Sequence, residues 1–508
     1  MASAPFLNAA EALLEPALEL GLAGAPAVVG PDRTLTYADL RDEAFRTAQA
    51  LAGLGIRPGE RVVLLLRDSP EWVAAYLGIL AAGTVAVTVN LRSSDAELAH
   101  VLRDSECALV LLEAEFSPLW QRLRASGANC PAYTVRGTVP GLPAWEPRVA
   151  QAKPEFTPVR QPEDAMAFWI YTSGTTGEMK ACVHRQRDVL LGDAYLRDIL
   201  GVRPGMRLFA TSKLFFAYAL GTCLFGALRL GATAILLDVW PTPVAVEVLL
   251  ERHRPHIVFS VPAFYRALLR SGAAGHRAFR GVQTWVSAGE RLPVPVYERW
   301  RETVGSAIVE GMGTSETVFM ILTQRPCATA PGSSGRPAPG VQARLLDPAG
   351  HAVTTPGQPG MLAVRTESTL STYWNQPERT AAVLREGWLV TGDVFTVDPQ
   401  GNWHHGGRAE DRIAAGTGSI NPADIEERLH ELPGVADACI VATGAPDALS
   451  VTVCAVPTPN ADMPALAMAI RAEVARWLPP PLPPAQVRWL PDLPRTASGK
   501  VQRYRLRV

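Results

Sequence analysis

The sequence is poor in cysteine and nearly neutral in charge. Its 508 residues include seven cysteines scattered singly, with no C-x-x-C pair, so neither a disulfide framework nor a zinc site is predicted. The formal net charge is −1, which gives no long-range field to attract nucleic acid or an anionic membrane. We therefore expect no nucleic-acid partner, no membrane partner and a reducing, cytoplasmic environment.

The amino terminus lacks a basic segment followed by an apolar one, so no export signal is expected. One uncharged run of twenty residues, WVAAYLGILAAGTVAVTVNL (72–91), has the length to cross a bilayer, but Gly83 interrupts it. The part before Gly83 suits a buried helix, and TVAVTVN is short and β-branched like a strand. With RVVLLL (61–66) ahead of it, the run predicts strand, helix, strand.

The same alternation of apolar strand-like and helix-like segments recurs between Arg207 and Gly289. Strands this apolar are buried on both faces, which predicts an α/β fold with largely parallel sheets. From about Val341 the pieces become shorter and are separated by Gly and Pro, which indicates a more antiparallel, β-rich subdomain. The last section, of about a hundred residues after Arg408, has its own helix and strands and the size of a small α+β domain.

A hydroxyl- and glycine-rich segment, YTSGTTGEMK, follows an apolar strand and runs from Tyr171 to Lys180. Its amides and hydroxyls are of the kind that surround phosphate oxygens. It is not a Walker P-loop, because Gly174 and Gly177 are too close together. An ordinary surface loop is the alternative interpretation.

Several further segments occur in the order expected of one family, so that the chain resembles the adenylate-forming superfamily of acyl-CoA synthetases, luciferases and peptide-synthetase adenylation domains. KLFFAYALG (213–221) resembles the benzoate-CoA ligase branch more narrowly. The segments that carry the resemblance, besides 171–180, are SAGE (287–290), GMGTSE (311–316), YWNQPERT (373–380), TGD (391–393), GRAED (407–411) and PRTASGK (494–500).

The resemblance implies an N-terminal domain (1–407) that binds ATP and the acid, a hinge (408–412) and a mobile C-terminal domain (413–508). It implies an AMP-forming ligase that uses ATP and Mg²⁺ to adenylate an aromatic acid and then transfers the acyl group to CoA. The implied ATP-binding residues are Thr172, Ser173, Gly174, Thr175, Thr176, Gly177, Lys180, Ser287, Ala288, Gly289, Glu290, Gly311, Met312, Gly313, Thr314, Asp393 and Arg408.

The implied catalytic residues are Lys500, Glu316 and Ser315. Lys500 would draw the substrate carboxylate and the α-phosphate together, and Glu316 would be the Mg²⁺ ligand. Ser315 stands where the family usually has Thr and keeps the hydroxyl. Asp411 matches the hinge position, and His184 is expected to support the phosphate loop.

The implied acyl pocket is lined by Phe216, Ala217, Tyr218, Gly313 and Phe319, which suits a flat ring better than a long alkyl chain. Packing of these aromatics in the core is the alternative interpretation. No charged residue occurs in 214–220, which disfavours a charged ring substituent. Benzoate or a neutral amino- or hydroxybenzoate such as anthranilate is therefore expected.

The chain departs from the family after the hinge, where Ala414 replaces a lysine and Thr417 a glycine, with Gly416 and Gly418 on either side. This departure keeps open an amide synthetase, or an adenylating enzyme that feeds a carrier protein. A non-catalytic binding protein would be expected to lose Lys500 or Glu316, and both are present. The oligomeric state is left open, a homodimer included.

Overall fold

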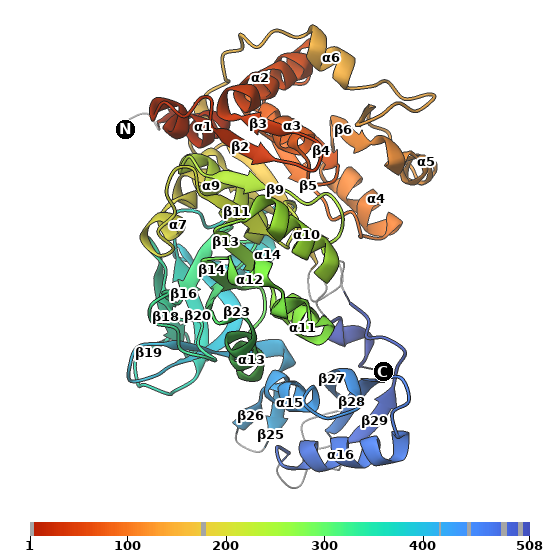
Figure 1. The fold of residues 1–508 in the computed structure, drawn as a ribbon, viewed down its shortest axis with the longest axis vertical. Coiled ribbons are helices and arrows are strands. Elements are labelled where there is room, and N and C mark those ends of the chain that lie inside the picture. Colours follow the sequence, from red (N-terminus) through yellow and green to blue (C-terminus); the bar gives the residue numbers. More distant parts are fainter. Residues whose placement is uncertain are drawn as a thin grey trace. The chain divides into compact units, whose positions relative to one another are not determined.

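The structure is a computed structural model, and it describes residues 5–173, 179–415, 418–443, 449–478, 485–495 and 501–507. The chain divides into two compact units. The first unit comprises residues 1–172, 179–343 and 364–389, and the second comprises 173–178, 344–363 and 390–508. Figure 1 shows the elements of both units, coloured along the sequence. The second unit thus begins before the predicted hinge, and the domain limits drawn from the sequence stay a prediction.

The first unit contains a seven-stranded sheet in the order β21-β10-β9-β5-β4-β6-β7. Its central strands pair in parallel, with Val63 opposite both Val87 of β5 and Val110 of β6. This pairing confirms the expectation from the apolar runs. The strands are β4 (Arg61–Leu65), β5 (Val85–Thr88), β6 (Leu109–Glu113), β7 (Ala132–Val135), β9 (Met166–Ser173), β10 (Met179–Arg185) and β21 (Thr372–Tyr373).

A nine-stranded sheet in the order β17-β16-β15-β14-β13-β11-β12-β2-β3 forms the rest of the first unit's framework. The pairs from β2 to β15 are parallel, and β3, β16 and β17 add antiparallel edges. The strands are β2 (Pro26–Val29), β3 (Thr34–Thr36), β11 (Arg207–Ala210), β12 (Thr233–Ile235), β13 (Ile257–Ser260), β14 (Thr284–Ser287), β15 (Ile308–Gly313), β16 (Met320–Thr323) and β17 (Arg336–Pro337). A short pair joins β1 (Phe6–Leu7) to β8 (Gln161–Pro162).

Helices connect these strands, as expected of crossover connections between parallel strands. The α-helices are α1 (Ala9–Glu19), α2 (Tyr37–Gly53), α3 (Pro70–Ala81), α4 (Asp95–Asp104), α5 (Ser117–Ala125), α6 (Glu146–Gln151), α7 (Ala194–Asp198), α8 (Ala217–Ala219), α9 (Gly226–Arg229), α10 (Pro243–His253), α11 (Pro262–Ser271), α12 (Arg277–Arg280), α13 (Val294–Val304) and α14 (Pro377–Val383). Between α8 and α9 the backbone forms a π-helical segment, η3 (Leu220–Phe225), and such segments are frequent at functional sites.

The uncharged run 72–91 folds as the sequence predicts, into α3 and β5. Ser69 caps α3 by accepting a hydrogen bond from the amide of Trp72, and Pro70 occupies the first turn. Gly83 has a φ of +69°, a conformation that a glycine adopts without strain, and it separates the helix from the strand. Within the described residues, no helix has both the length and the apolar character that crossing a membrane requires.

The second unit contains antiparallel strand pairs, as the short segments separated by Gly and Pro after Val341 predict. β18 pairs with β19, and β23 pairs with β24. The strands of this sheet are β18 (Gln342–Leu346), β19 (Ala352–Val353), β20 (Gly360–Arg365), β22 (Leu384–Arg385), β23 (Trp388–Val397) and β24 (Trp403–Arg408). Of these, β22 belongs to the first unit, and β18, β20 and β23 have residues in both units.

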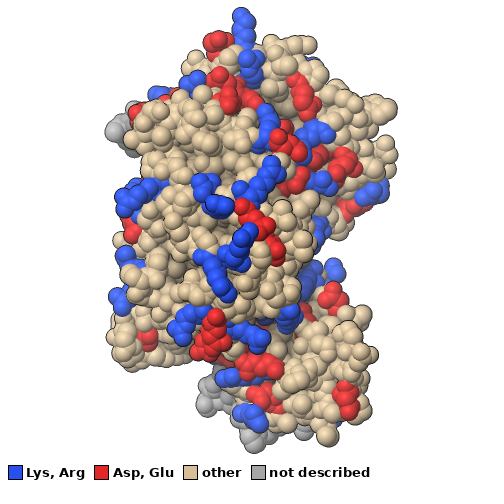
Figure 2. Space-filling view, in the orientation of Figure 1, with Lys and Arg blue, Asp and Glu red and all other residues tan. Residues whose placement is uncertain are grey.

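The carboxyl-terminal section of the second unit packs two helices with a three-stranded sheet, β27-β28-β29, around its own core. This agrees with the expected small α+β fold. Its elements are β25 (Ile413–Ala415), β26 (Gly418–Ile420), α15 (Pro422–Leu429), β27 (Val435–Thr443), β28 (Ser450–Pro457), α16 (Met463–Ala475) and β29 (Gln486–Trp489). On the face shown in Figure 2, basic and acidic side chains are interspersed, in keeping with the small net charge.

Candidate active site

The hydroxyl-rich segment 171–180 joins β9 to β10, two neighbouring strands of the seven-stranded sheet. The hydroxyl of Tyr171 donates to the carboxylate of Asp104 over 2.7 Å, and burial raises the pKa of this tyrosine. The strand is therefore held firmly at the point where the segment leaves it. The structure does not describe the side chain of Ser173, and Gly174, Thr175, Thr176 and Gly177 lie outside the described residues. The phosphate contacts predicted for these five residues stay predictions.

Glu316 and Lys180 come together in the structure, and Tyr373 joins them. Lys180 Nζ lies 3.2 Å from Glu316 Oε1 and 2.7 Å from the Tyr373 hydroxyl, which itself donates to Glu316 Oε1 over 2.6 Å. Burial acts to raise the pKa of Glu316, but the charge of Lys180 and the hydrogen bond from Tyr373 hold it below its usual value. Glu316 is therefore an ionised carboxylate, the hard oxygen donor that suits Mg²⁺.

The turn that carries Glu316 is fixed through its backbone. The carbonyl of Glu316 accepts from the amide of Leu370, and that of Thr317 accepts from the Ser368 hydroxyl. Val318 follows with a φ of +63°, a strained conformation for a buried β-branched residue. Such strain persists only where the surroundings determine the backbone, as these hydrogen bonds do here.

His184 supports this turn from below. Its Nε2 lies 2.8 Å from the carbonyl oxygen of Ser315, and its Nδ1 lies 3.2 Å from Asp188. The ring is fully buried and stacks on Phe168 at 4.9 Å. The sequence assigned His184 to the support of the phosphate loop, and the structure shows its contact with the Ser315 turn.

Two of the predicted ATP-binding segments, 287–290 and 311–314, lie at the carboxyl ends of two adjacent parallel strands. Ser287 ends β14 opposite Glu310 of β15, so Ser287–Glu290 and Gly311–Thr314 lie near one edge of the sheet. Ligands of open α/β sheets bind at the carboxyl ends of the strands. The Ser287 hydroxyl is buried and has no hydrogen-bond partner in the described structure. A Cβ at Gly311 would lie 2.9 Å from the Leu322 carbonyl, so packing against β16 accounts for that glycine.

Asp393 and Arg408, two of the predicted ATP-binding residues, pair with each other across β23 and β24 of the second unit. Asp393 Oδ2 lies 3.1 Å from Arg408 Nη1, and Oδ1 lies 3.0 Å from Nε2 of His405. Arg408 also donates to the carbonyl of Thr391. The two predicted residues and His405 therefore form one polar cluster on adjacent strands.

The predicted acyl-pocket residues lie around the start of α8 and the end of the Glu316 turn. A Cβ on Gly221 would lie 2.9 Å from the Phe319 ring, and one on Gly313 would lie 3.0 Å from the Phe319 carbonyl. Ala217 and Phe319 are both 7% exposed. The Tyr218 hydroxyl lies 3.3 Å from the carbonyl of Val286, so the one phenolic OH that the sequence offered to a substrate already has a protein acceptor.

Asp411, the predicted hinge residue, lies in a short 3-10 segment, η5 (Ala409–Asp411), and accepts from Arg507 over 2.9 Å. Lys500, the predicted catalytic lysine, lies outside the described residues. So does Thr417, and the structure does not describe the Ala414 side chain. The roles of Lys500 and of the altered segment after the hinge therefore stay predictions.

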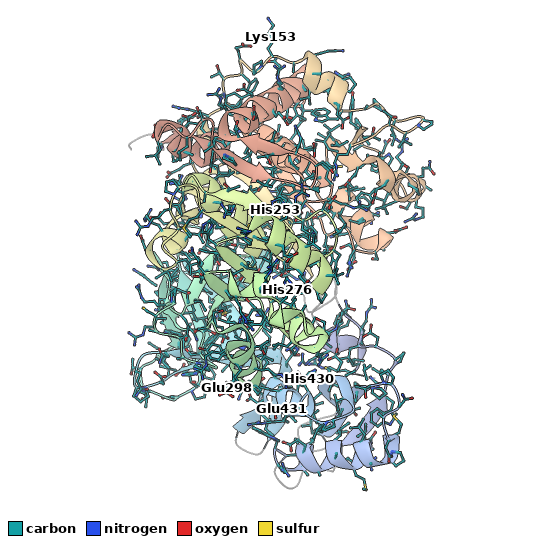
Figure 3. All side chains as sticks on the ribbon, viewed as in Figure 1. Lys153, His253, His276, Glu298, His430 and Glu431 are labelled. Carbon is teal, nitrogen blue, oxygen red and sulfur yellow. The ribbon has the colours of Figure 1, made fainter. Side chains whose placement is uncertain are left out.

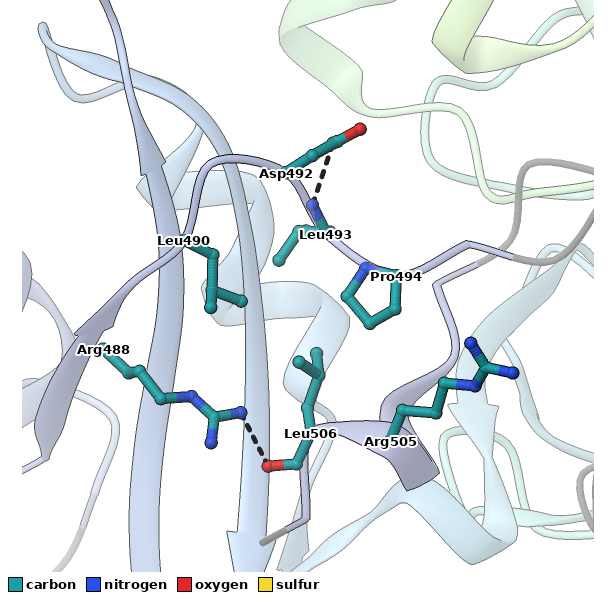
Figure 4. A pocket seen from close by; sticks show the side chains of 7 residues that line it. All are labelled: Arg488, Leu490, Asp492, Leu493, Pro494, Arg505 and Leu506. Atoms are coloured by element: carbon teal, nitrogen blue, oxygen red, sulfur yellow. Dashed lines mark hydrogen bonds between the residues drawn. The ribbon is translucent and has the colours of Figure 1, made fainter.

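An open pocket of about 510 Å³ lies in the second unit and shares no residue with the predicted site (Figure 4). Arg488 Nη2 donates to the carbonyl of Leu506 over 2.9 Å, so this guanidinium is tied to the chain itself. The lining residues are Arg488, Leu490, Asp492, Leu493, Pro494, Arg505 and Leu506. Nothing in this lining resembles the polar constellation around Glu316.

Sequence reasoning missed Tyr373 and His405 as site residues. Tyr373 opens YWNQPERT, one of the segments that carries the family resemblance, yet no residue of that segment was given a role. His405 precedes the GRAED segment by two positions, and the pairing of β23 with β24, with its register shift after Asp393, brings it beside Asp393. In both residues the signal lay in the motif's neighbourhood and needed the strand pairing to be recognised.

Family models match most of the chain. The AMP-binding enzyme family matches residues 21–374, and the AMP-binding enzyme C-terminal domain matches residues 424–500. The chain belongs to the AMP-binding enzyme family, which confirms the resemblance read from the motifs.

Curated relatives and solved structures agree with this assignment. The chain is 41% identical to a 3-hydroxybenzoate–CoA ligase of Aromatoleum sp. (strain CIB), over 99% of this chain and 96% of the relative. It is 40% identical to a 3-hydroxybenzoate–CoA/4-hydroxybenzoate–CoA ligase of Thauera aromatica, over 99% and 97%. A crystal structure of an anthranilate CoA ligase in complex with anthranoyl-AMP matches with a TM-score of 0.90 and 30% identity, over 99% of this chain and 97% of that chain.

Proposed function

We propose that this chain is an ATP-dependent aryl-CoA ligase. The carboxylate of an aromatic acid attacks the α-phosphorus of ATP and pyrophosphate leaves; the thiol of CoA then attacks the acyl carbon and AMP leaves. The observation that carries the proposal is the ionised Glu316 held by Lys180 and Tyr373. Full-length similarity to hydroxybenzoate–CoA ligases supports it.

Glu316 fits a Mg²⁺ site, because its carboxylate is a hard oxygen donor beside a segment expected to bind phosphate. When bound, Mg²⁺ would neutralise charge on the phosphates of ATP. Lys180 would supply a second cation at the same place. Because the Tyr373 hydroxyl donates to Glu316 Oε1, we assign Tyr373 the role of orienting this ligand.

We propose that the acid is a hydroxybenzoate, whose ring substituent is uncharged, and that 3-hydroxybenzoate is the preferred substrate. The two relatives above carry that substrate in their names. The wall over 214–220 has no charged side chain, and the buried Ala217 and Phe319 suit a flat ring. Because Tyr218 is engaged by Val286, ring selectivity would come from shape more than from this phenol.

The remaining catalytic roles follow the family resemblance. We assign Lys500 to the adenylation step, where its charge would bring two anions together. Asp411 is assigned to the hinge about which the C-terminal domain turns between the two half-reactions. Asp393 is assigned to the ribose hydroxyls, and Arg408 is assigned to the ribose or a phosphate.

The direct test is incubation of the protein with ATP, Mg²⁺, CoA and one acid at a time, analysed by mass spectrometry. The acids are 3-hydroxybenzoate, 4-hydroxybenzoate, benzoate, anthranilate and decanoate. We expect 3-hydroxybenzoyl-CoA and AMP as the main products. Decanoate as the best substrate would refute the aryl pocket. Acyl-AMP without acyl-CoA, with an amide once an amine is added, would replace the proposal by an amide synthetase.

A further inference from the structure

A buried lysine lies next to the predicted acyl pocket, in a part of the site that the mechanism above does not use. Lys213 follows β11 and is 6% exposed. Its ammonium donates to the main-chain carbonyl of Leu237 and, over 2.5 Å, to that of Val239. Both carbonyls belong to the segment that follows β12, the neighbour of β11. The lysine thus ties two strand ends together.

A buried aspartate completes the arrangement. Asp68 follows β4 of the other sheet and precedes α3, and both of its carboxylate oxygens lie 3.2 Å from the amide nitrogen of Leu214. It is 5% exposed. Two consecutive residues are therefore held in place. Lys213 is held through its own ammonium, and Leu214 is held through its backbone amide, which donates to Asp68.

The charged groups around Asp68 and Lys213 are Asp238, Arg67 and Arg92. Burial raises the pKa of Asp68 to about 6, while Lys213 acts to lower it and Asp238 to raise it. Burial lowers the pKa of Lys213, which Asp68 and Asp238 oppose and which Arg67 and Arg92 reinforce. Asp238 is in turn 3.5 Å from Arg136. Burying charged groups is costly unless hydrogen bonds satisfy them, and here the carbonyls of Leu237 and Val239 satisfy the ammonium while the Leu214 amide satisfies the carboxylate.

The position of the pair indicates its role. The amide of Phe216 donates to the carbonyl of Lys213 over 2.9 Å, and α8 begins at the next residue. The wall formed by Phe216, Ala217 and Tyr218 therefore starts directly from the residues that the pair immobilises. None of the contacts described for Lys213 or Asp68 involves a residue of the Glu316 cluster.

We propose that Lys213 and Asp68 are positioning residues of the acyl pocket, which hold the wall 216–218 in place and so set affinity and selectivity for the aromatic ring. The proposal rests on the aryl-ligase function above. It assigns neither residue a contact with the substrate. Substitution of either residue should therefore weaken binding of the aromatic acid and leave binding of ATP unchanged, because the wall 216–218 would move while the Glu316 turn would not.

The test compares Lys213→Met, Lys213→Arg, Asp68→Asn and the double variant Asp68→Asn/Lys213→Met, with Lys153→Met as the matched control. Lys153 is an exposed lysine, labelled in Figure 3, that belongs to neither the acyl-pocket set nor the Glu316 cluster. Because misplacement of a substrate by about 1 Å can cost about a hundredfold, we expect Lys213→Met to raise KM for the acid about ten- to a hundredfold. KM for ATP should change less than about twofold, the tolerance expected for an uncoupled site.

Selectivity between two acids distinguishes a positioning role from a general effect on stability, because a loss of stability alone would not change it. The ratio of kcat/KM for 3-hydroxybenzoate to that for benzoate should fall in each single variant and change less in the double variant than the product of the single effects. If Lys213→Met does not fold, Lys213→Arg and Asp68→Asn answer the same question. Folded variants with the wild-type KM for acid and the wild-type ratio would overturn the proposal.

Failure of the proposed function can be told apart from failure of this inference. If the wild type activates no aryl acid, the aryl-ligase function falls, and the variants are then compared on whichever acid supports pyrophosphate exchange. An equal rise of KM for ATP and for the acid would mean that the pair supports the whole unit and not the acyl wall. That outcome also overturns the proposal.

Discussion

The hydroxyl of Tyr373 lies 2.6 Å from Glu316 Oε1, and the two residues are brought together by β21 beside β10. The same hydroxyl lies 2.7 Å from Lys180 Nζ. A phenol that donates to a carboxylate and accepts from an ammonium fixes the geometry of both. Tyr373 thus organises the ligand that the family resemblance assigns to Mg²⁺.

Removal of this hydroxyl should weaken metal use. A hydrogen bond to a charged group contributes about 1.5–3 kcal/mol, so Tyr373→Phe should raise the Mg²⁺ concentration for half-maximal rate by about tenfold or more. The measurement is the initial rate of pyrophosphate exchange against Mg²⁺ at saturating acid. Tyr504→Phe, at an exposed tyrosine, is the control. An unchanged Mg²⁺ profile in the folded variant would remove Tyr373 from the site.

The acyl-pocket assignment makes a steric prediction. Ala217 is 7% exposed in the segment that follows Lys213, so Ala217→Phe should fill the space meant for the ring. We expect use of hydroxybenzoates and benzoate to be lost while ATP binding, measured by equilibrium titration, is kept. Normal rates with 3-hydroxybenzoate would show that Ala217 does not face the substrate.

The buried Asp68 predicts a pH dependence of stability. Its pKa is raised from 3.8 to about 6 in the folded state, so the folded state binds more protons than the unfolded state between these values. The contribution of Asp68 to the free energy of unfolding should therefore fall as the pH rises from about 4 to about 6, by up to about 3 kcal/mol.

The Asp68→Asn variant lacks this titration and tests it. Relative to wild type, its free energy of unfolding in urea should increase by a similar amount over the same pH range, on top of a constant difference due to the uncompensated Lys213. Asp39 and the other titratable groups away from this position are present in both proteins, so their contributions cancel in the difference. A difference that does not vary between pH 4 and pH 7 would contradict the raised pKa.

The sequence predicts the local elements well and the long-range contacts less well. Hydrophobic periodicity and helix-ending residues suffice to predict α3 and β5, because Ser69, Pro70 and Gly83 act through their immediate neighbours in the sequence. The contact of Tyr373 with Lys180 joins residues almost two hundred positions apart, and it depends on the pairing of β21 with β10. No periodicity in one sequence encodes which edge strand joins which sheet.

The same limit applies to charge near the acyl pocket. The absence of charged residues in 214–220 is visible in the sequence, and the structure adds that Lys213, the residue just before, points its charge into the protein. Asp68 could not have been linked to it, because it follows a strand of the other sheet. Only the packing of the two sheets places a carboxylate at the Leu214 amide.

Lys500 tests the catalytic assignment taken from the resemblance. We expect Lys500→Ala to lower adenylation by several orders of magnitude while ATP still binds, because the lysine would act chiefly in the transition state. Pyrophosphate exchange reports adenylation, and equilibrium titration reports ATP binding. Lys153→Ala controls for the loss of a surface lysine. Near-normal formation of acyl-AMP by Lys500→Ala would exclude the residue from the mechanism.

Asp411 separates the two half-reactions. The hinge assignment requires backbone rotation at this residue, and proline fixes φ near −65°, so Asp411→Pro should block the rotation. Proline also removes the carboxylate that accepts from Arg507, and Asp411→Ala, which loses that contact and keeps a free backbone, is the matched control. Adenylation in Asp411→Pro should survive if the locked state corresponds to the first half-reaction, while thioester formation from preformed acyl-AMP and CoA should collapse.

Asp411→Ala should keep both half-reactions within about tenfold of wild type, because an exposed ion pair contributes little. Equal loss in the Pro and Ala variants would place the effect in the contact with Arg507. Full thioester formation by Asp411→Pro would mean that the rotation takes place elsewhere in 408–412 or is not needed. Since Ala414 and Thr417 alter the segment just beyond, loss of acyl-CoA with retained acyl-AMP, seen only in Asp411→Pro, would indicate that CoA transfer still uses the second conformation.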